Sequence, residues 1–110
     1  MLTRTAWAMV LGLGAMTYGP VSWAAEASGK ANYDKLCVSC HAADGKGNPA
    51  MTKVFGEKAL DIVSKETAVK KDDEMLKVIV EGRGKMPASG KSLSKQEQKD
   101  VLEHMRGLAK

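Results

Sequence analysis

Residues 37–41 read Cys37-Val38-Ser39-Cys40-His41. On a helix with about 3.6 residues per turn, the two cysteines lie close to one turn apart on the same side. They can present two thiols to the two vinyl groups of one haem, while the adjacent His41 imidazole binds the iron from one side. The spacing C-x-x-C-H is the attachment motif of c-type haem. We therefore expect one covalently bound haem c, with its iron, at Cys37, Cys40 and His41.

Other uses of a cysteine pair fit this chain less well. A thioredoxin-like redox pair needs a βαβ context, but here a polar helical segment precedes the motif and no strand pattern follows it. A structural zinc site needs four ligands, and the second histidine, His104, fits no common zinc-finger spacing. A disulfide between Cys37 and Cys40 would close a very small loop and would add little stability.

The first 24 residues differ in composition from the rest of the chain. Arg4 is the only charged residue before Glu26, an apolar run covers residues 6–16, and Ser22-Trp23-Ala24 ends the segment with small residues at its first and third positions. A basic start, a short apolar run and a small-x-small end are typical of a secretory signal peptide. We expect residues 1–24 to be removed by cleavage after Ala24.

Cleavage after Ala27 is the alternative, and a retained membrane anchor is a competing interpretation. The apolar run is shorter than the roughly 20 residues that a bilayer-spanning helix needs, so we expect no membrane insertion after cleavage. The mature domain, residues 25–110, then has only Tyr33 and Phe55 as aromatic residues. A domain this small usually needs a staple such as a cofactor. Export predicts a periplasmic location in a Gram-negative bacterium.

Apolar residues recur at helical spacing in three segments, which we expect to be the main helices of an all-α domain. These segments are about residues 28–40, 72–81 and 95–108. The third segment is preceded by Ser94, which has the spacing of a capping box with Glu97. Residues 50–71 keep no long period and predict a loop with one or two short helical turns. Residues 82–91 are too rich in glycine and proline to be helical.

The second iron ligand separates an electron carrier from a gas-binding or peroxidatic haem, because histidine and methionine together favour electron transfer. Four methionines follow His41: Met51, Met75, Met86 and Met105. Met75 and Met105 fall on apolar helix faces and fit a role in core packing. Met51 is too close to His41 in sequence to reach the far side of the ring easily. Met86 lies 45 residues after His41 in the glycine- and proline-rich loop, so we predict it as the second ligand.

At this point the chain resembles a class I c-type cytochrome of the small bacterial monohaem kind, over about residues 28–108. The matching residues are Gly29, Tyr33, the motif at 37–41, Asp44-Gly45-Lys46-Gly47, Pro49, residues 79–82, Lys85-Met86-Pro87 and Leu93-Ser94. The resemblance implies a cytochrome c-like fold in which three main helices and short helical turns surround one haem.

The same resemblance assigns roles to individual residues. It implies that His41 and Met86 ligate the iron, and that the Pro49 carbonyl accepts a hydrogen bond from the free nitrogen of His41. It also implies that Gly29 and Tyr33 on the first helix pack against the last helix.

Two residues of the last helix depart from the family pattern. His104 stands where an aromatic residue usually faces the first helix, and Gln98 replaces a usual aliphatic residue. These departures concern how tightly the two helices cross. We interpret His104 as a packing or surface residue.

The function that we expect is electron transport between a redox donor and an acceptor protein, by a monomer that is not an enzyme. Apolar side chains expected around the ring are Leu36, Val54, Ile79 and Leu102. Lysines expected in the surrounding loops, where they would steer an acidic partner or simply be solvated, are Lys46, Lys53, Lys85 and Lys91. No basic run with interleaved aromatics suggests nucleic-acid binding. The alternatives are a haem subunit of a larger oxidoreductase complex, or a five-coordinate haem peroxidase or gas-binding protein.

Overall fold

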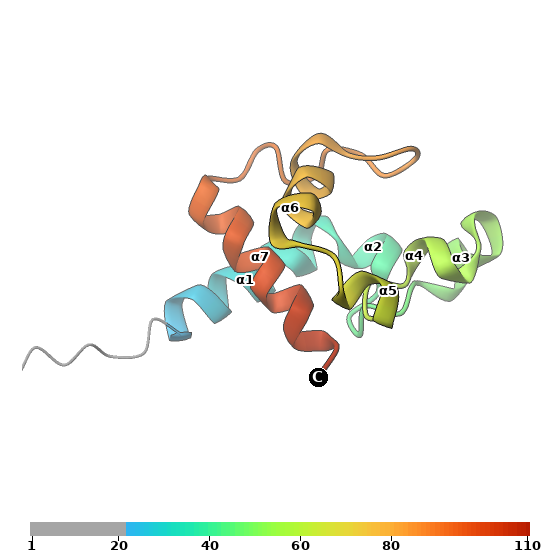
Figure 1. The fold of residues 1–110 in the computed structure, drawn as a ribbon, viewed down its shortest axis with the longest axis horizontal. Helices are drawn as coiled ribbons and strands as arrows, with labels where there is room; N and C mark the ends of the chain where they lie inside the picture. Colours follow the sequence, from blue (N-terminus) through green and yellow to red (C-terminus); the bar gives the residue numbers. More distant parts are fainter. Residues whose placement is uncertain (1–21) are drawn as a thin grey trace, which may run out of the picture.

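The computed structural model describes residues 22–110, and within them all regular structure except one isolated bridge is helical. The helices, coloured in chain order in Figure 1, are α1 (Ser22–Leu36), α2 (Val38–His41), α3 (Pro49–Phe55), α4 (Glu57–Leu60), α5 (Lys65–Ala68), α6 (Asp72–Glu81) and α7 (Lys95–Leu108). The all-α prediction is therefore confirmed. Within this range, none of the helices has the length and apolar character that crossing a bilayer requires.

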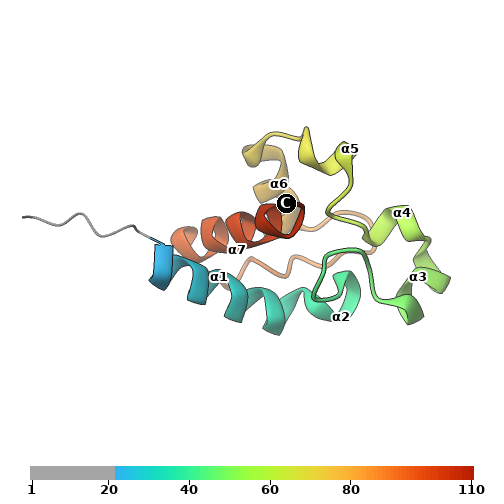
Figure 2. The ribbon, with the colours of Figure 1, turned by 90° about the horizontal axis from the view of Figure 1, so that it is seen from below.

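The first and last long helices, α1 and α7, pack directly against each other (Figures 1 and 2). A Cβ on Gly29 would overlap the backbone carbonyl oxygen of Asp100, so only glycine permits this approach. One turn further along α1, the fully buried Tyr33 ring lies 5.0 Å from the His104 ring, centroid to centroid. The predicted packing of Gly29 and Tyr33 against the last helix is confirmed, and the histidine still allows a close crossing.

The core gathers around Tyr33 and is completed by α6. Its buried members are Tyr33, Met75, Ile79, Leu102 and Met105. The prediction that Met75 and Met105 serve core packing is confirmed. Outside the core, Arg106 ties α7 to the start of α6, because its guanidinium donates to the Asp72 carboxylate and to the Lys70 carbonyl, both at 2.7 Å.

The two best-defined helices have the bounds that the sequence predicts. Asp72, Asp73 and Glu74 occupy the first turn of α6, where the helix dipole favours negative charge. The capping box of α7 is present: the Ser94 hydroxyl accepts from the Glu97 N–H at 3.1 Å, and the Glu97 carboxylate accepts from the Ser94 N–H at 3.0 Å.

Two regions differ from expectation. The predicted helix over residues 28–40 begins earlier, at Ser22, and is interrupted at Cys37, after which α2 continues to His41. Residues 49–68 contain three short helices where one or two turns are predicted. Two of them begin at side-chain caps, since Asn48 accepts from Ala50 N–H and Ser64 from Thr67 N–H. Of the predicted signal peptide, residues 1–21 lie outside the described residues.

Candidate haem site

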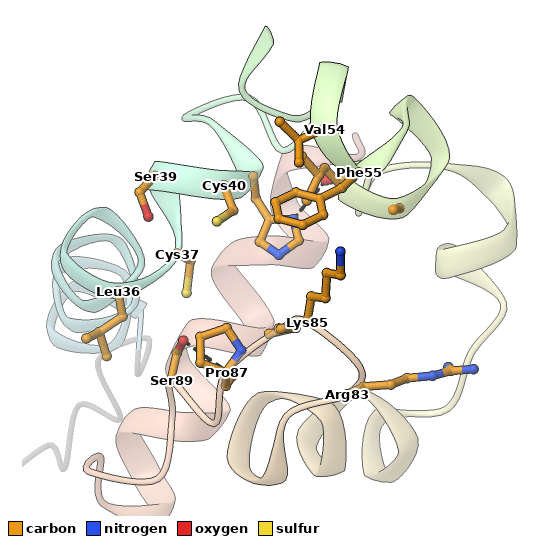
Figure 3. Close-up of a pocket in the computed structure, with 14 residues that line it drawn as sticks. Leu36, Cys37, Ser39, Cys40, Val54, Phe55, Arg83, Lys85, Pro87 and Ser89 are labelled. Atoms are coloured by element: carbon orange, nitrogen blue, oxygen red, sulfur yellow. Dashed lines mark hydrogen bonds between the residues drawn. The ribbon is translucent and has the colours of Figure 1, made fainter. Parts of the chain in front are cut away.

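A cavity of about 410 Å³ lies between α2, α3, the end of α4 and the loop that follows α6 (Figure 3). This volume lies within the roughly 300–1,000 Å³ of small-molecule and cofactor sites. All four residues predicted as the site line it: Cys37, Cys40, His41 and Met86. Met51 does not line the cavity. The fold thus brings the motif and a loop 45 residues away to one place.

His41 is buried at the end of α2, and its Nδ1 lies 2.7 Å from the carbonyl oxygen of Leu60. A carbonyl can only accept, so Nδ1 must carry the hydrogen, and Nε2 keeps its lone pair for a metal. The expectation that Pro49 supplies this acceptor is wrong. Pro49 is the first residue of α3, and its carbonyl accepts from the Thr52 hydroxyl at 2.9 Å. Leu60 ends α4, where helix carbonyls are left without intrahelical partners.

The residue after the motif, Ala42, is held in an unusual backbone conformation. Its φ of 62° and ψ of 167° lie in a region that residues with a Cβ rarely adopt. The Tyr33 hydroxyl donates to the Ala42 carbonyl at 2.6 Å. Burial, followed by the nearby Cys37, raises the pKa of Tyr33, so its hydroxyl remains a donor. Tyr33 therefore helps to hold the turn that directs His41.

The turn that follows the motif folds back onto α2. The Gly47 N–H donates to the His41 carbonyl at 2.9 Å, and the Asn48 N–H donates to the Cys40 carbonyl at 2.8 Å. Gly47 has a φ of 108°, which a residue with a Cβ would adopt only under strain. These bonds fix the end of α2 and with it the imidazole.

Cys37 and Cys40 are half-buried free thiols, and Figure 3 shows both side chains on the cavity side of the helix. Burial, followed by the neighbouring Cys40, raises the pKa of the Cys37 thiol to about 11. Without a cofactor, this thiol is therefore protonated at neutral pH.

Met86 lies at the end of a tight turn after α6. The Met86 N–H donates to the Arg83 carbonyl at 2.9 Å, and the Arg83 N–H donates to the Met86 carbonyl at 3.1 Å. Gly82 precedes this turn with a φ of 77°, and a Cβ there would lie only 2.6 Å from the Met86 carbonyl oxygen. Position 82 therefore requires glycine, because a side chain there would collide with the backbone of Met86.

Apolar and cationic side chains share the rim of the cavity. Val54 is 68% exposed, and the Lys85 ammonium lies 5.3 Å from the centroid of the Phe55 ring. Leu36 and Val54 line the cavity as predicted. The expectation for Ile79 and Leu102 is wrong, because neither lines the cavity and both belong to the buried cluster around Tyr33. Their helix faces are taken up by the packing of α6 against α7.

Comparison with known protein families gives a match. The chain matches the family described as cytochrome C oxidase, cbb3-type, subunit III, over residues 24–105. The chain belongs to this cytochrome c family. Among curated proteins and among solved structures, nothing matches it. Membership implies a covalently bound c-type haem with its iron, and electron transport with redox partner proteins.

The residues of the cavity fit such a haem. Two free thiols, Cys37 at the N-cap of α2 and Cys40 within α2, are spaced for two thioether bonds, and a buried imidazole has its outer nitrogen already satisfied by Leu60. A methionine on the loop provides the soft ligand that haem iron accepts. The sequence led to the four side chains that line the cavity, but it did not lead to the Leu60 and Ala42 carbonyls, because backbone acceptors have no residue signature.

Proposed function

We propose that this cytochrome c is an exported, periplasmic electron carrier whose haem iron is ligated by His41 and Met86 and whose porphyrin is attached to Cys37 and Cys40. The observation that carries the proposal is that these four residues, from two distant segments, line one cavity of about 410 Å³. A histidine and a methionine together favour electron transfer over gas or peroxide chemistry.

Each residue has a defined role in this proposal. The Cys37 and Cys40 thiols would hold the porphyrin through two thioether bonds. His41 presents Nε2, because Leu60 holds Nδ1. Such an outer hydrogen bond orients an imidazole and raises its basicity as a ligand. Met86 supplies its thioether sulfur from the opposite loop.

When bound, the haem supplies a one-electron Fe(III)/Fe(II) couple. His41 and Met86 would hold the iron in both oxidation states, which would keep reorganisation small. With both residues bound, a small molecule would find no free ligand position on the iron. The apolar lining from Leu36 and Val54 favours the less charged, reduced state.

Carbon monoxide binding tests this function against a five-coordinate peroxidase or gas-binding protein. We expect the reduced wild-type protein to keep its visible spectrum under carbon monoxide, because Met86 blocks access to the iron. Reduced Met86→Ala is expected to bind the gas. A wild-type protein that binds carbon monoxide readily would favour the five-coordinate alternative.

The partner is expected to be acidic where it docks. The predicted steering lysines are all exposed, and none of them appears among the ion pairs of residues 22–110: Lys46, Lys53, Lys85 and Lys91. Charges that steer association lose their effect as salt screens them. The rate of electron transfer to an acidic partner should therefore fall as ionic strength rises. This dependence on ionic strength should be weaker in Lys85→Gln. A rate independent of salt would indicate that these lysines are merely solvated.

A haem subunit of a larger oxidoreductase is the second candidate, and the family description, which names an oxidase subunit, favours it. The two candidates differ in assembly. A carrier would be recovered as a monomer when the periplasmic fraction is released. A subunit would instead migrate with a large complex after mild detergent extraction. N-terminal sequencing of the mature protein tests export, since removal of residues 1–24 predicts a start at Ala25.

A further inference from the structure

A glutamine on α7 is bonded to the loop that contains Met86. The Gln98 amide is half-buried, and its Nε2 donates to the carbonyl oxygens of Gly90 at 3.0 Å and Leu93 at 3.1 Å. Both hydrogens of the NH₂ group are thereby used. An aliphatic residue, as the resembled family usually has here, could make neither bond.

Gly90 is the point at which the loop is anchored. Its N–H donates to the Ile79 carbonyl at 2.8 Å, while its own carbonyl accepts from Gln98. Gly90 is buried, and a Cβ there would overlap Cγ2 of Ile79. The backbone of Gly90 is therefore held from both sides, by the last turn of α6 through its N–H and by the start of α7 through its carbonyl.

We infer that Gln98 is a positioning residue that keeps Met86 on the haem side of its loop. The loop leaves α6 at Gly82 and is closed again at Gly90, only four residues after Met86. Within it, the short turn between Arg83 and Met86 has its own pair of backbone bonds. The Gln98 amide adds a second anchor at the Gly90 end, so the loop that contains Met86 cannot swing away from α6 and α7 without breaking these bonds. This inference rests on the proposed ligation by Met86.

Gln98→Leu removes both donors while keeping a side chain of similar size. The Leu93 carbonyl then loses its bond from Gln98, and the buried Gly90 carbonyl keeps only the Leu93 N–H at 3.1 Å, which penalises the closed loop. Displacement of Met86 by added imidazole reports on this directly, through loss of the weak far-red absorption band that sulfur ligation gives the oxidised protein. We expect half-displacement at about a tenfold lower imidazole concentration, or ~1.4 kcal/mol.

Gln98→Glu separates hydrogen bonding from packing. Glutamate matches glutamine in shape, but its carboxylate presents acceptors to two carbonyl oxygens. If the amide acts as a donor, imidazole should displace Met86 in Gln98→Glu at a still lower concentration than in Gln98→Leu. If only side-chain volume mattered, the glutamate variant would instead be the milder of the two, and the inference would be overturned.

Gln96→Leu is the matched control. Gln96 lies on the same helix, and its Nε2 donates to the Asp100 carboxylate at 2.9 Å rather than to the loop. We expect Gln96→Leu to change the denaturation midpoint but not the imidazole concentration at which half of Met86 is displaced. Imidazole binding by Gln98→Leu equal to that of the wild type and of Gln96→Leu would refute the role of Gln98. A wild-type protein without the far-red band would refute the ligation by Met86 itself, and this inference with it.

Discussion

The Tyr33 hydroxyl is the most informative polar group in the core. It is fully buried and donates to the carbonyl of Ala42, whose backbone is strained and whose neighbour is His41. Tyr33→Phe keeps the ring against His104 and removes only this bond. We expect the free energy of unfolding to fall by about 1–3 kcal/mol, because the Ala42 carbonyl is left without its donor. Urea denaturation of the holoprotein measures it, and an unchanged midpoint would show that the bond holds nothing.

At the scale of single residues, the sequence predicts side chains far better than it predicts their backbone partners. The motif residues Cys37, Cys40 and His41 can be identified from the sequence because the chemistry of haem attachment dictates their spacing. Met86 is predicted because a loop can cross to the far side of a ring, which methionines on packed helix faces cannot do. The acceptor for His41 is the Leu60 carbonyl and not the predicted Pro49 carbonyl. Every residue has a carbonyl, and the path of the chain through α3 and α4 decides which one lies next to His41.

At the scale of elements, the crossing of α1 and α7 depends on a missing side chain. A Cβ on Gly29 would overlap the Asp100 carbonyl and would lie 3.1 Å from Cβ of His104. Gly29→Ala should therefore push the helices apart and lower the free energy of unfolding by about 1–3 kcal/mol, the usual cost of overpacking. Thermal denaturation followed by circular dichroism measures this change.

Gly107 provides the control for that substitution. It lies within α7, and a Cβ there would meet nothing within 4 Å. Gly107→Ala should stabilise the protein by roughly 0.5–1 kcal/mol, because alanine loses less conformational freedom in a helix than glycine. If both glycine variants were equally stabilising, the close crossing of α1 and α7 would be refuted.

Helices with a strong apolar stripe and a clear start were predictable, and short ones were not. The bounds of α6 and α7 follow from their stripes together with an acidic first turn and a capping box. The helices between residues 49 and 68 are too short to show a period. Their starts depend on single caps such as Asn48 and Ser64, and asparagine and serine are also common in turns.

At the scale of the whole molecule, His104 links the packing of α1 on α7 to pH. Burial beside Tyr33 lowers the pKa of His104 below its ordinary value of 6.5, and the nearby Lys30 lowers it further, while Asp34 opposes the shift. The unfolded chain therefore binds a proton more readily than the native one. The contribution of this histidine to stability is complete above about pH 6.5 and is lost as the pH falls through that value towards the native pKa.

Denaturation midpoints at neutral and mildly acidic pH test this linkage. The midpoint of the wild-type protein should fall between about pH 7.5 and pH 5.5, and His104→Gln should show a smaller fall. Glu97 acts in a separate window: hydrogen bonds from Ser94 lower its pKa from 4.5, so its loss appears only at more acid pH. An identical pH dependence in wild type and His104→Gln would contradict the assignment.

The cavity is formed only when several elements of the whole molecule come together. Its walls come from α2, α3, α4 and the loop after α6, and no local pattern indicates how these short elements meet. The small aromatic content of residues 25–110 does suggest that a cofactor completes the interior. What could not be foreseen is which apolar residues face it, because Ile79 and Leu102 are used by the helix core instead.

The most direct test of the central claim is the far-red absorption of the oxidised holoprotein in three forms. Sulfur ligation to haem iron predicts the weak band in the wild-type protein and in Met51→Leu, whose methionine does not line the cavity. Met86→Ala is predicted to lose the band while retaining the covalent haem at Cys37 and Cys40. Absence of the band from the wild type, or its survival in Met86→Ala, would contradict ligation by His41 and Met86.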